Sequence, residues 1–315
     1  MLNRARIGYS RGGMTRYAVR TLTLNPSIDV SSDTDKVEPT RKVRTCNERI
    51  DPGGGGINVA RVLHRFGTNV EAIFLAGGAT GDAFDALLER TRLSRRVVRI
   101  ADDTRTSLTI HDRSTGNEYR FVPEGPTIEP AELDACRDAI AAERSDWFVA
   151  SGSLPPGVPE DFYATARAMA CREGGRFILD TSGAELRAAL SAGGIFLVKA
   201  SGEELAPAAA AEIVAQRRAE QVAVTLGREG ALLVNAGGTY FLPTLQTEPV
   251  STVGAGDSFL GGLTCGLARG LDPLHAFRLA VAAGAAATLS PGTDLAYPED
   301  VERLLDAIPQ PERLT

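Results

Sequence analysis

The sequence predicts an α/β protein in which helices cover both faces of a mostly parallel central sheet, giving a three-layer sandwich with a small β-sheet lid. Three observations lead to this prediction. Short apolar runs alternate with segments of helical periodicity along most of the 315 residues. Glycine accounts for 33 residues, above the usual share of about 7%, and gathers in turns that follow the apolar runs. Two polar-faced extended stretches without helices, residues 28–50 and 106–121, interrupt the alternation and predict the lid.

The expected elements follow the pattern of apolar residues along the chain. The first strand is Ala18–Leu24, and the first helix is Gly56–Phe66, where Ile57, Ala60 and Leu63 share one face. Further strands are expected at residues 70–75, 147–150, 177–180, 195–198, 221–225, 231–235 and 239–242. Further helices are expected at residues 83–91, 160–173, 184–192, 255–269, 273–289 and 298–308, with one short alanine-rich helix between 202 and 220.

Composition narrows the range of partners and compartments. A formal net charge of −6 and a pI of about 5.3 argue against a nucleic-acid-binding surface. The 4 cysteines form no C-x-x-C pair, which indicates a reducing compartment and predicts a cytoplasmic protein. The sequence contains no run of 18 apolar residues, so no membrane partner is expected. Residues 1–17 read as an N-terminal extension, with Met14 as the candidate initiator, and residues 18–315 read as one domain.

The segment Thr252–Ser258, with the sequence TVGAGDS, gives the sharpest functional signal. It follows a loop and opens a long apolar helix, so its backbone N–H groups and the helix dipole predict an anion site. Asp257 is expected in the first turn beside that site, where a carboxylate can accept a proton from a substrate hydroxyl. The alternative is that Asp257 is only an acid stabilised by the helix dipole.

Three further glycine-containing segments favour a phosphate-binding site. Residues 51–58, DPGGGGIN, contain consecutive glycines before a helix and permit close approach of a ligand to the backbone, although a flexible turn is the alternative. The segments SGSLPPG at 151–157 and TLGREG at 225–230 each follow a predicted strand, where open α/β sheets bind their ligands. The sequence has neither a Walker motif nor the dinucleotide motif G-x-G-x-x-G, and it lacks protein-kinase motifs.

These segments, in this order, resemble the ribokinase-like (PfkB) family of carbohydrate kinases over about residues 18–310. The run GAGD at 254–257 is highly specific for that superfamily, and residues 52–58, 76–81 and 118–121 resemble its minor ATP-dependent 6-phosphofructokinases. The resemblance implies a ribokinase-like fold and a reaction with ATP and Mg²⁺. It also implies that fructose 6-phosphate is phosphorylated at its C1 hydroxyl to fructose 1,6-bisphosphate, and that homodimers form through the lids.

The resemblance implies a role for each matching residue. Asp257 would be the catalytic base, and the backbone of Gly254, Ala255 and Gly256 would form the anion hole. Sugar-phosphate contacts are implied for a set from the strand ends, the glycine run and the lid: Asp29, Lys42, Gly54, Gly55, Asn58, Arg105 and Ser153. Nucleotide contacts are implied at two later strand ends: Lys199, Thr225, Gly227 and Gly230. Glu204 would hold Mg²⁺ through water, and a monovalent cation such as K⁺ would bind among Ser251, Val253, Ala287, Ser290 and Gly292.

The sequence departs from the family pattern at two places that bear on function. Ser201 stands where the family often has the Asn of P-N-x-x-E, so a weakened or rearranged organisation of Mg²⁺ is expected around Glu204. The glycine run reads Gly53–Gly56, whereas 1-phosphofructokinases and tagatose-6-phosphate kinases usually have G-G-K-G. Fructose 6-phosphate is therefore the expected substrate, with those two activities as alternatives. A non-catalytic sugar-phosphate sensor is a third alternative, against which Asp257 argues because a sensor needs no base.

Overall fold

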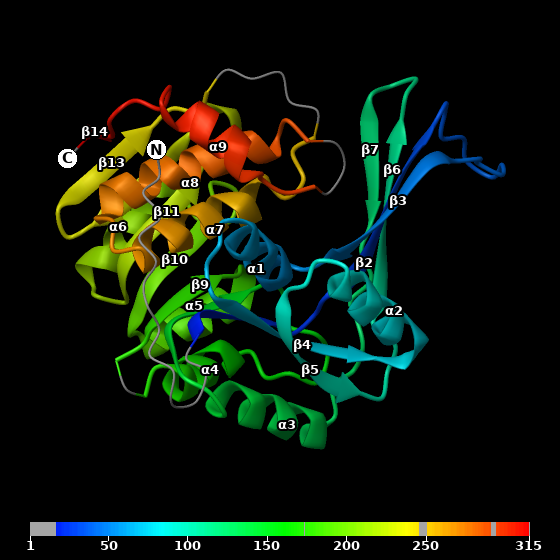
Figure 1. The fold of residues 1–315 in the computed structure, drawn as a ribbon, viewed down its shortest axis with the longest axis horizontal. Helices are drawn as coiled ribbons and strands as arrows, with labels where there is room; N and C mark the ends of the chain where they lie inside the picture. The colour runs from blue at the N-terminus through cyan, green and yellow to red at the C-terminus, as the bar shows by residue number, and fades with distance from the viewer. Residues whose placement is uncertain (1–16, 173, 246–250, 291–293, 315) are drawn as a thin grey trace.

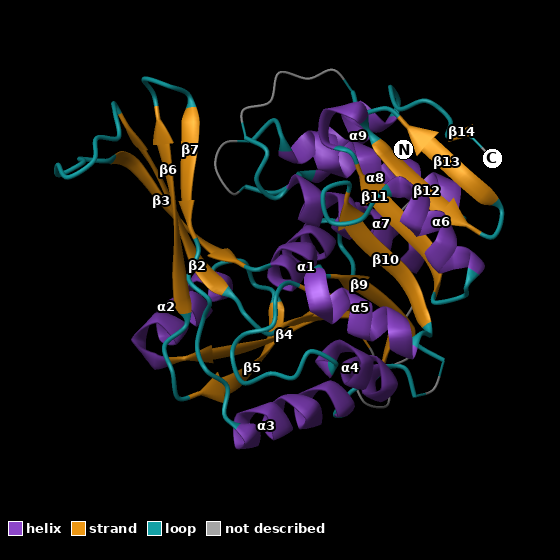
Figure 2. Cartoon of the chain, turned by 180° about the vertical axis from the view of Figure 1, so that it is seen from behind, coloured by secondary structure: helices purple, strands orange, loops and turns teal. Residues whose placement is uncertain are grey.

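The computed structural model describes residues 17–172, 174–245, 251–290 and 294–314 (Figure 1). A ten-stranded sheet lies between two layers of helices, and a separate four-stranded sheet projects from one side (Figures 1 and 2). This architecture confirms the predicted three-layer fold with a small second sheet. The expected N-terminal extension lies, apart from Tyr17, outside the described residues. Within the part of the chain that the structure describes, no helix is long and apolar enough to cross a membrane.

The large sheet is mostly parallel, and the chain adds strands first on one side of β1 and then on the other. In spatial order its strands are β14-β13-β12-β11-β10-β9-β8-β1-β4-β5. Their bounds are β1 (Tyr17–Thr23), β4 (Val70–Gly77), β5 (Ser94–Ile100), β8 (Ser145–Ser151), β9 (Arg176–Asp180), β10 (Ile195–Ser201), β11 (Ala219–Thr225), β12 (Ala231–Asn235), β13 (Gly238–Leu242) and β14 (Glu312–Arg313). The strands from β5 to β11 pair in parallel, and β12 to β14 extend the sheet antiparallel. Because the chain leaves β1 toward β4 and later returns to β8 on the other side, the carboxyl ends of β1 and β8 form a topological switch point, where ligands bind in such sheets.

Two apolar cores bury the two faces of this sheet. One layer of helices consists of α1 (Gly55–Arg65), α2 (Gly78–Glu89), α7 (Ala255–Ala268), α8 (Pro273–Ala287) and α9 (Pro298–Leu305). The opposite layer consists of α3 (Pro130–Ala141), α4 (Phe162–Ala170), α5 (Gly183–Ala192) and α6 (Pro207–Ala215). Because both faces are covered, the central strands are apolar along their length, and all 8 residues of β4 are buried. Phe259 of α7 packs edge-on against Phe277 of α8 at 6.2 Å, which fixes the helix that carries the GAGD run.

The four-stranded sheet, here called the lid, consists of the two segments that the sequence assigned to it. Its order is β3-β2-β6-β7, with bounds β2 (Ser27–Thr34), β3 (Cys46–Gly53), β6 (Arg105–Asp112) and β7 (Asn117–Phe121). Since side chains alternate between faces, the strand register defines two chemically different faces. One face is charged and carries Asp29, Asp51, Arg105 and Arg120. The other carries an apolar row across all four strands: Ile50, Val30, Leu108 and Phe121.

The structure contains elements that the sequence pattern did not predict. Strand β5 (SRRVVRI) was missed because its arginines obscure the apolar alternation. Helix α3 was missed as well, and its position depends on a contact distant in sequence. The fully buried guanidinium of Arg20 donates hydrogen bonds to the carbonyls of Ala139, Ile140 and Glu143 at the end of α3 and pairs with Glu71 at 2.8 Å. Helix α2 begins at Gly78, five residues before the predicted start at residue 83.

Candidate active site

The N-terminus of α7 forms a backbone turn that suits glycine. Gly254 is the N-cap in the left-handed region with φ of 77°, and the Ser258 N–H donates to its carbonyl at 2.9 Å. A Cβ at Gly256 would lie 3.1 Å from Nζ of Lys199, so glycine there leaves room for the ammonium beside the helix N-terminus. The first-turn N–H groups, the helix dipole and a lysine charge thus meet at one point, which is the composition of an anion site.

The carboxylate of Asp257 lies between two groups of side chains. Asn58 of α1 donates a hydrogen bond from Nδ2 to Oδ2 of Asp257 at 2.8 Å. Burial and the nearby carboxylate of Asp180 raise the pKa of Asp257 to about 6, although the charge of Lys199 and the hydrogen bond from Asn58 act in the opposite direction. An acid with a pKa near 6 is largely ionised at neutral pH and remains a competent proton acceptor.

A buried ion pair supports this carboxylate from the ends of three adjacent strands. Asp180, the last residue of β9, accepts a hydrogen bond from Ser151 Oγ at 3.0 Å and pairs with Lys199 Nζ at 3.1 Å. Burial disfavours the ammonium of Lys199, but the carboxylates of Asp180 and Asp257 outweigh burial and raise the pKa of Lys199. Lys199 therefore stays charged and faces the anion site.

A second cluster lies where the lid meets the glycine run before α1. A Cβ at Gly55 would lie 2.1 Å from Oγ of Ser151, so the run packs directly against the end of β8, and Gly54 caps α1. Burial raises the pKa of Asp29 on β2, against the lowering effects of the Ser27 hydrogen bond and the charge of Arg105. Arg105 donates to the carbonyls of Asn25 and Pro123, both at 2.8 Å.

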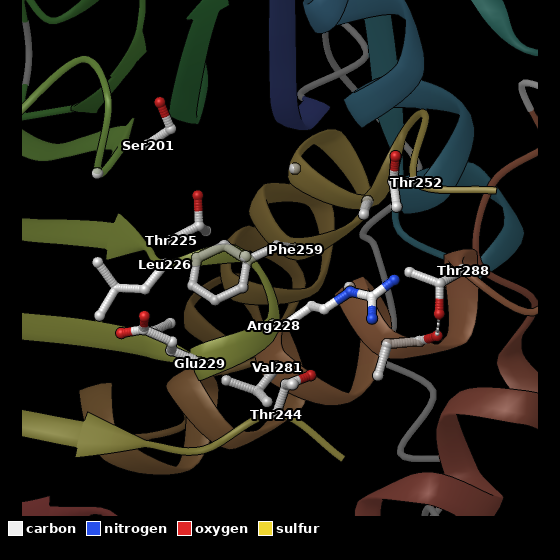
Figure 3. A pocket seen from close by; sticks show the side chains of 18 of the residues that line it. Ser201, Thr225, Leu226, Arg228, Glu229, Thr244, Thr252, Phe259, Val281 and Thr288 are labelled. Atoms are coloured by element: carbon white, nitrogen blue, oxygen red, sulfur yellow. Dashed lines mark hydrogen bonds between the residues drawn. The ribbon is translucent and has the colours of Figure 1, made fainter. Parts of the chain in front are cut away.

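A groove of about 820 Å³ lies beside the first turn of α7, where Ala255 and Gly256 line it, and its size is typical of small-molecule sites. Its walls come from the ends of β10 and β11, the turn after β11, and helices α7 and α8 (Figure 3). Leu226, Phe259 and Val281 give it an apolar part, and Arg228 extends across it toward Thr288 (Figure 3). Three of the four predicted nucleotide contacts, Thr225, Gly227 and Gly230, line this groove, whereas Lys199 is not among its lining residues.

Comparison with known proteins decides which kind of site this is. The profile of the pfkB family carbohydrate kinases matches residues 22–300. The chain belongs to the pfkB family of carbohydrate kinases. It is 42% identical over 305 residues to the ATP-dependent 6-phosphofructokinase isozyme 2 of Mycobacterium tuberculosis, covering 92% of this chain and 90% of that protein. It is 33% identical over 264 residues to a 1-phosphofructokinase of Xanthomonas campestris, covering 78% of this chain and 83% of that protein. A crystal structure of phosphofructokinase-2 from Escherichia coli with fructose-6-phosphate superposes with a TM-score of 0.86 at 36% identity, covering 93% of this chain and 99% of that chain.

The kinase places its candidate metal ligands at the edge of the groove. Ser201 donates to Oε2 of Glu204 from its backbone N–H at 2.8 Å and from its hydroxyl at 2.9 Å, so the serine orients this exposed carboxylate. Across the described residues, no three His, Cys, Asp or Glu side chains form a metal-binding group. Such a site fits Mg²⁺ carried mainly by substrate phosphates and water, for which one or two protein carboxylates are sufficient.

The predicted monovalent-cation residues come from two segments that lie side by side. The Ser251 N–H donates to the carbonyl of Thr288 at 3.4 Å, which brings Ser251 and Val253 next to the end of α8 at Ala287 and to Ser290. Gly292, the remaining predicted ligand, lies outside the described residues.

Two predicted sugar-phosphate residues are placed differently from the others. Lys42 is exposed and belongs to the segment between β2 and β3, which extends from the outer end of the lid (Figure 1). Among the described residues, no hydrogen bond or ion pair joins Lys42 to Asp29 or Asn58. Ser153 is exposed after β8 and accepts a hydrogen bond from Asn25 Nδ2 at 3.3 Å, which places it near the base of the lid.

Sequence reasoning assigned no role to three charged residues near the candidate site. Asp180 was assigned only as a strand end, although a polar residue at the carboxyl end of a buried parallel strand was the available signal. Arg61 is buried in α1 and donates to Oδ1 of Asn58 at 3.2 Å. An arginine at this place in a helical pattern is normally expected on the solvent-exposed face of the helix. Arg120 of the lid lines the groove, and only the folding of the lid reveals this.

Proposed function

We propose that this kinase transfers the γ-phosphoryl group of ATP to the C1 hydroxyl of fructose 6-phosphate, giving fructose 1,6-bisphosphate and ADP. The observation that carries the proposal is the position of Asp257. Its carboxylate contacts Asn58 on the side of the glycine run and interacts with the charge of Lys199, and the neighbouring Gly256 lines the groove. Two relatives named phosphofructokinase, one of them crystallised with fructose-6-phosphate, support the choice of sugar phosphate.

Asp257 acts as the general base. Asn58 fixes the carboxylate through Oδ2 and leaves Oδ1 for the sugar hydroxyl. As the C1 oxygen forms its bond to the γ-phosphorus, Asp257 accepts the hydroxyl proton, and the bond from phosphorus to the bridging oxygen breaks to release ADP. Positioning and charge stabilisation supply most of the catalysis in such transfers.

The backbone of residues 254–257 and the ammonium of Lys199 stabilise the transferred group. The helix N-terminus directs N–H groups at developing negative charge, and the pair with Asp180 holds Lys199 in place at 3.1 Å. The apolar part of the groove is suited to a nucleotide base, with Thr225, Gly227 and Gly230 beside it.

The sugar phosphate binds between the glycine run and the charged face of the lid. Asp29, Asn58, Gly54, Gly55 and Ser153 are suited to hydroxyl contacts. Arg105 is suited to phosphate binding, because one N–H of each terminal nitrogen donates to a carbonyl that fixes the guanidinium at the base of the lid, and its remaining N–H groups stay available for the phosphate. Lys42 completes the proposed set, and its place at the lid tip supports delivery from the lid of a partner subunit.

The metal ions have separate proposed places. Mg²⁺ neutralises the charge of the ATP phosphates, and Glu204, oriented by Ser201, holds it through water. A monovalent cation such as K⁺ binds at the loop of Ser251 and Val253 beside Ala287 and Ser290, and a potassium complex of the Escherichia coli relative supports this.

The apolar face of the lid supports a homodimer. Ile50, Leu108 and Phe121 are 49%, 41% and 58% exposed, and together with Val30, which lies between Ile50 and Leu108, they form one row across the strands. A second copy of the lid would cover this row, which is otherwise costly to leave in water. All 4 cysteines are free, which supports a reducing compartment such as the cytoplasm.

A coupled assay of ADP release tests the proposed function. We expect release that depends on both Mg²⁺ and fructose 6-phosphate and that is nearly lost in Asp257→Asn. Release that is independent of added sugar phosphate, or that is retained in the variant, contradicts the proposal.

A further inference from the structure

Arg120 lies on the lid face that looks toward the active site. In the lid register Arg120 of β7 pairs with Thr109 of β6, and Thr109 pairs with Ser31 of β2. Since side chains alternate along a strand, Arg120 projects from the same face as Asp29 and Arg105. Arg120 is level with Ser31, which lies two residues farther along β2 from the base of the lid than Asp29.

The side chain of Arg120 belongs to the nucleotide groove as well as to the lid. It lines the groove together with Ser201 and Thr225 at the strand ends and with Gly256 in the first turn of α7. Within the described residues, Arg120 is the lining residue that the lid supplies. Its charge also acts on Asp29, where it favours the ionised carboxylate as Arg105 does.

Arg120 is not held by other residues of the protein, in contrast to Arg105 and Lys199. Its guanidinium makes no ion pair or hydrogen bond with another described residue, and the side chain is exposed. Arg105 is held by two backbone carbonyls, and Lys199 is held by Asp180. An unpaired guanidinium at a groove is free to bind an anion without first breaking another contact.

We propose that Arg120 is a catalytic residue that contacts the phosphoryl group while it passes from the nucleotide to the sugar. The inference rests on the proposed kinase function and adds a residue to it. The charge of Arg120 acts on Asp29 in the proposed sugar pocket, and its side chain lines the groove together with Gly256. The transferred phosphoryl group is the part of the substrates that passes between these two places. No atom is exchanged with Arg120, which only stabilises charge.

Arginine suits this task for chemical reasons. Negative charge spreads over the equatorial oxygens of the phosphoryl group during transfer, and a planar guanidinium can bind two of them at once. Lysine carries the same charge without the paired geometry. Because the contact is made chiefly in the transition state, its loss lowers kcat and leaves substrate binding nearly unchanged.

Three variants test the proposal. In Arg120→Ala we expect kcat to fall by roughly 10²-fold or more, with both KM values within about threefold of wild type. In Arg120→Lys we expect a partial loss, on the order of tenfold. Arg113→Ala is the matched control, because Arg113 is a lid arginine paired with Asp33 that does not line the groove, and its kcat should stay within about twofold of wild type.

The outcomes separate this inference from the proposed function. A wild-type enzyme that phosphorylates fructose 6-phosphate, together with an Arg120→Ala variant within threefold of its kcat, overturns the role of Arg120 alone. A rise in KM with unchanged kcat also overturns it, because that result indicates simple substrate binding. Wild-type protein that phosphorylates no sugar phosphate refutes the proposed function itself. Far-UV circular dichroism and thermal melting of each variant confirm that folding is retained.

Discussion

Asn58 on α1 and Asp257 on α7 are joined by a 2.8 Å hydrogen bond although 199 residues separate them in the chain. The bond unites the glycine run and the GAGD run, the two motifs that the sequence singled out independently. Because Oδ2 accepts this bond, Oδ1 is the oxygen that we propose for the sugar hydroxyl. The geometry of proton transfer therefore depends on the packing of α1 against α7.

Asp257→Asn removes the proposed base while keeping the size of the side chain. We expect kcat to fall by at least ~10²-fold with nearly unchanged affinity for fructose 6-phosphate. The Asn58 bond survives, because the amide oxygen of the new asparagine can still accept it. Steady-state kinetics with isothermal titration of the sugar phosphate measures both quantities. A variant that retains more than a tenth of wild-type kcat contradicts the assignment.

The same substitution should make the folded protein more stable at neutral pH. The folded-state pKa of Asp257 is about 6, above its ordinary value of 3.8, so ionisation is disfavoured in the folded state. The stability contributed by this group is fully present below the unfolded pKa and is lost as pH rises through about 6. Asp257→Asn should therefore melt higher than wild type at pH 8, with the difference shrinking toward pH 4. An equal difference in melting temperature between variant and wild type at both pH values would show that the raised pKa of Asp257 does not cause the stabilisation.

Asp180→Asn should alter both the pH dependence and nucleotide binding. Asp180 raises the pKa of Asp257, so removing its charge moves the acid limb of kcat to lower pH. Lys199 also loses its ion pair, and KM for ATP should rise several-fold. Ser151→Ala is the control, since it removes one hydrogen bond to Asp180 and leaves the charge. An acid limb that is unmoved in Asp180→Asn argues against this coupling.

Glu204→Gln and Ser201→Ala should differ in the Mg²⁺ concentration that each variant needs for activity. Glu204 carries the charge that attracts the metal, whereas Ser201 only orients it through two hydrogen bonds. We expect the Mg²⁺ concentration for half-maximal activity to rise more in Glu204→Gln. Equal or reversed effects in Mg²⁺ titrations show that the metal is organised elsewhere.

Much of the fold was predictable because its signals are local. Strand β1 and helix α1 have regular apolar patterns, and the structure places them within a residue of the predicted bounds. Helix α3 was not predictable in the same way, because the buried side chain of Arg20 holds it through backbone carbonyls far along the chain. Nothing in the sequence around Arg20 in β1 indicates that its side chain caps the C-terminus of α3.

The site shows the same division. The GAGD run predicts an anion site from the sequence alone, because its glycines stand directly at the start of a helix. Asp180 and Arg120 reach the candidate site only through the topology that brings β9 to Lys199 and the lid to the groove. Periodicity cannot place such residues, since their partners lie on other strands. A polar residue that ends a buried strand is the sequence feature to inspect.

The phosphoryl acceptor is the central claim, and the ratio of kcat/KM for fructose 6-phosphate to that for fructose 1-phosphate tests it most directly. Gly55 packs against Ser151 with no room for a longer side chain, and Arg105 stands at the base of the lid to bind the 6-phosphate. We therefore expect fructose 6-phosphate to be favoured by at least ~10²-fold, and Arg105→Ala to reduce the preference mainly through KM. A higher kcat/KM with fructose 1-phosphate contradicts the account and assigns the chain to the 1-phosphofructokinases.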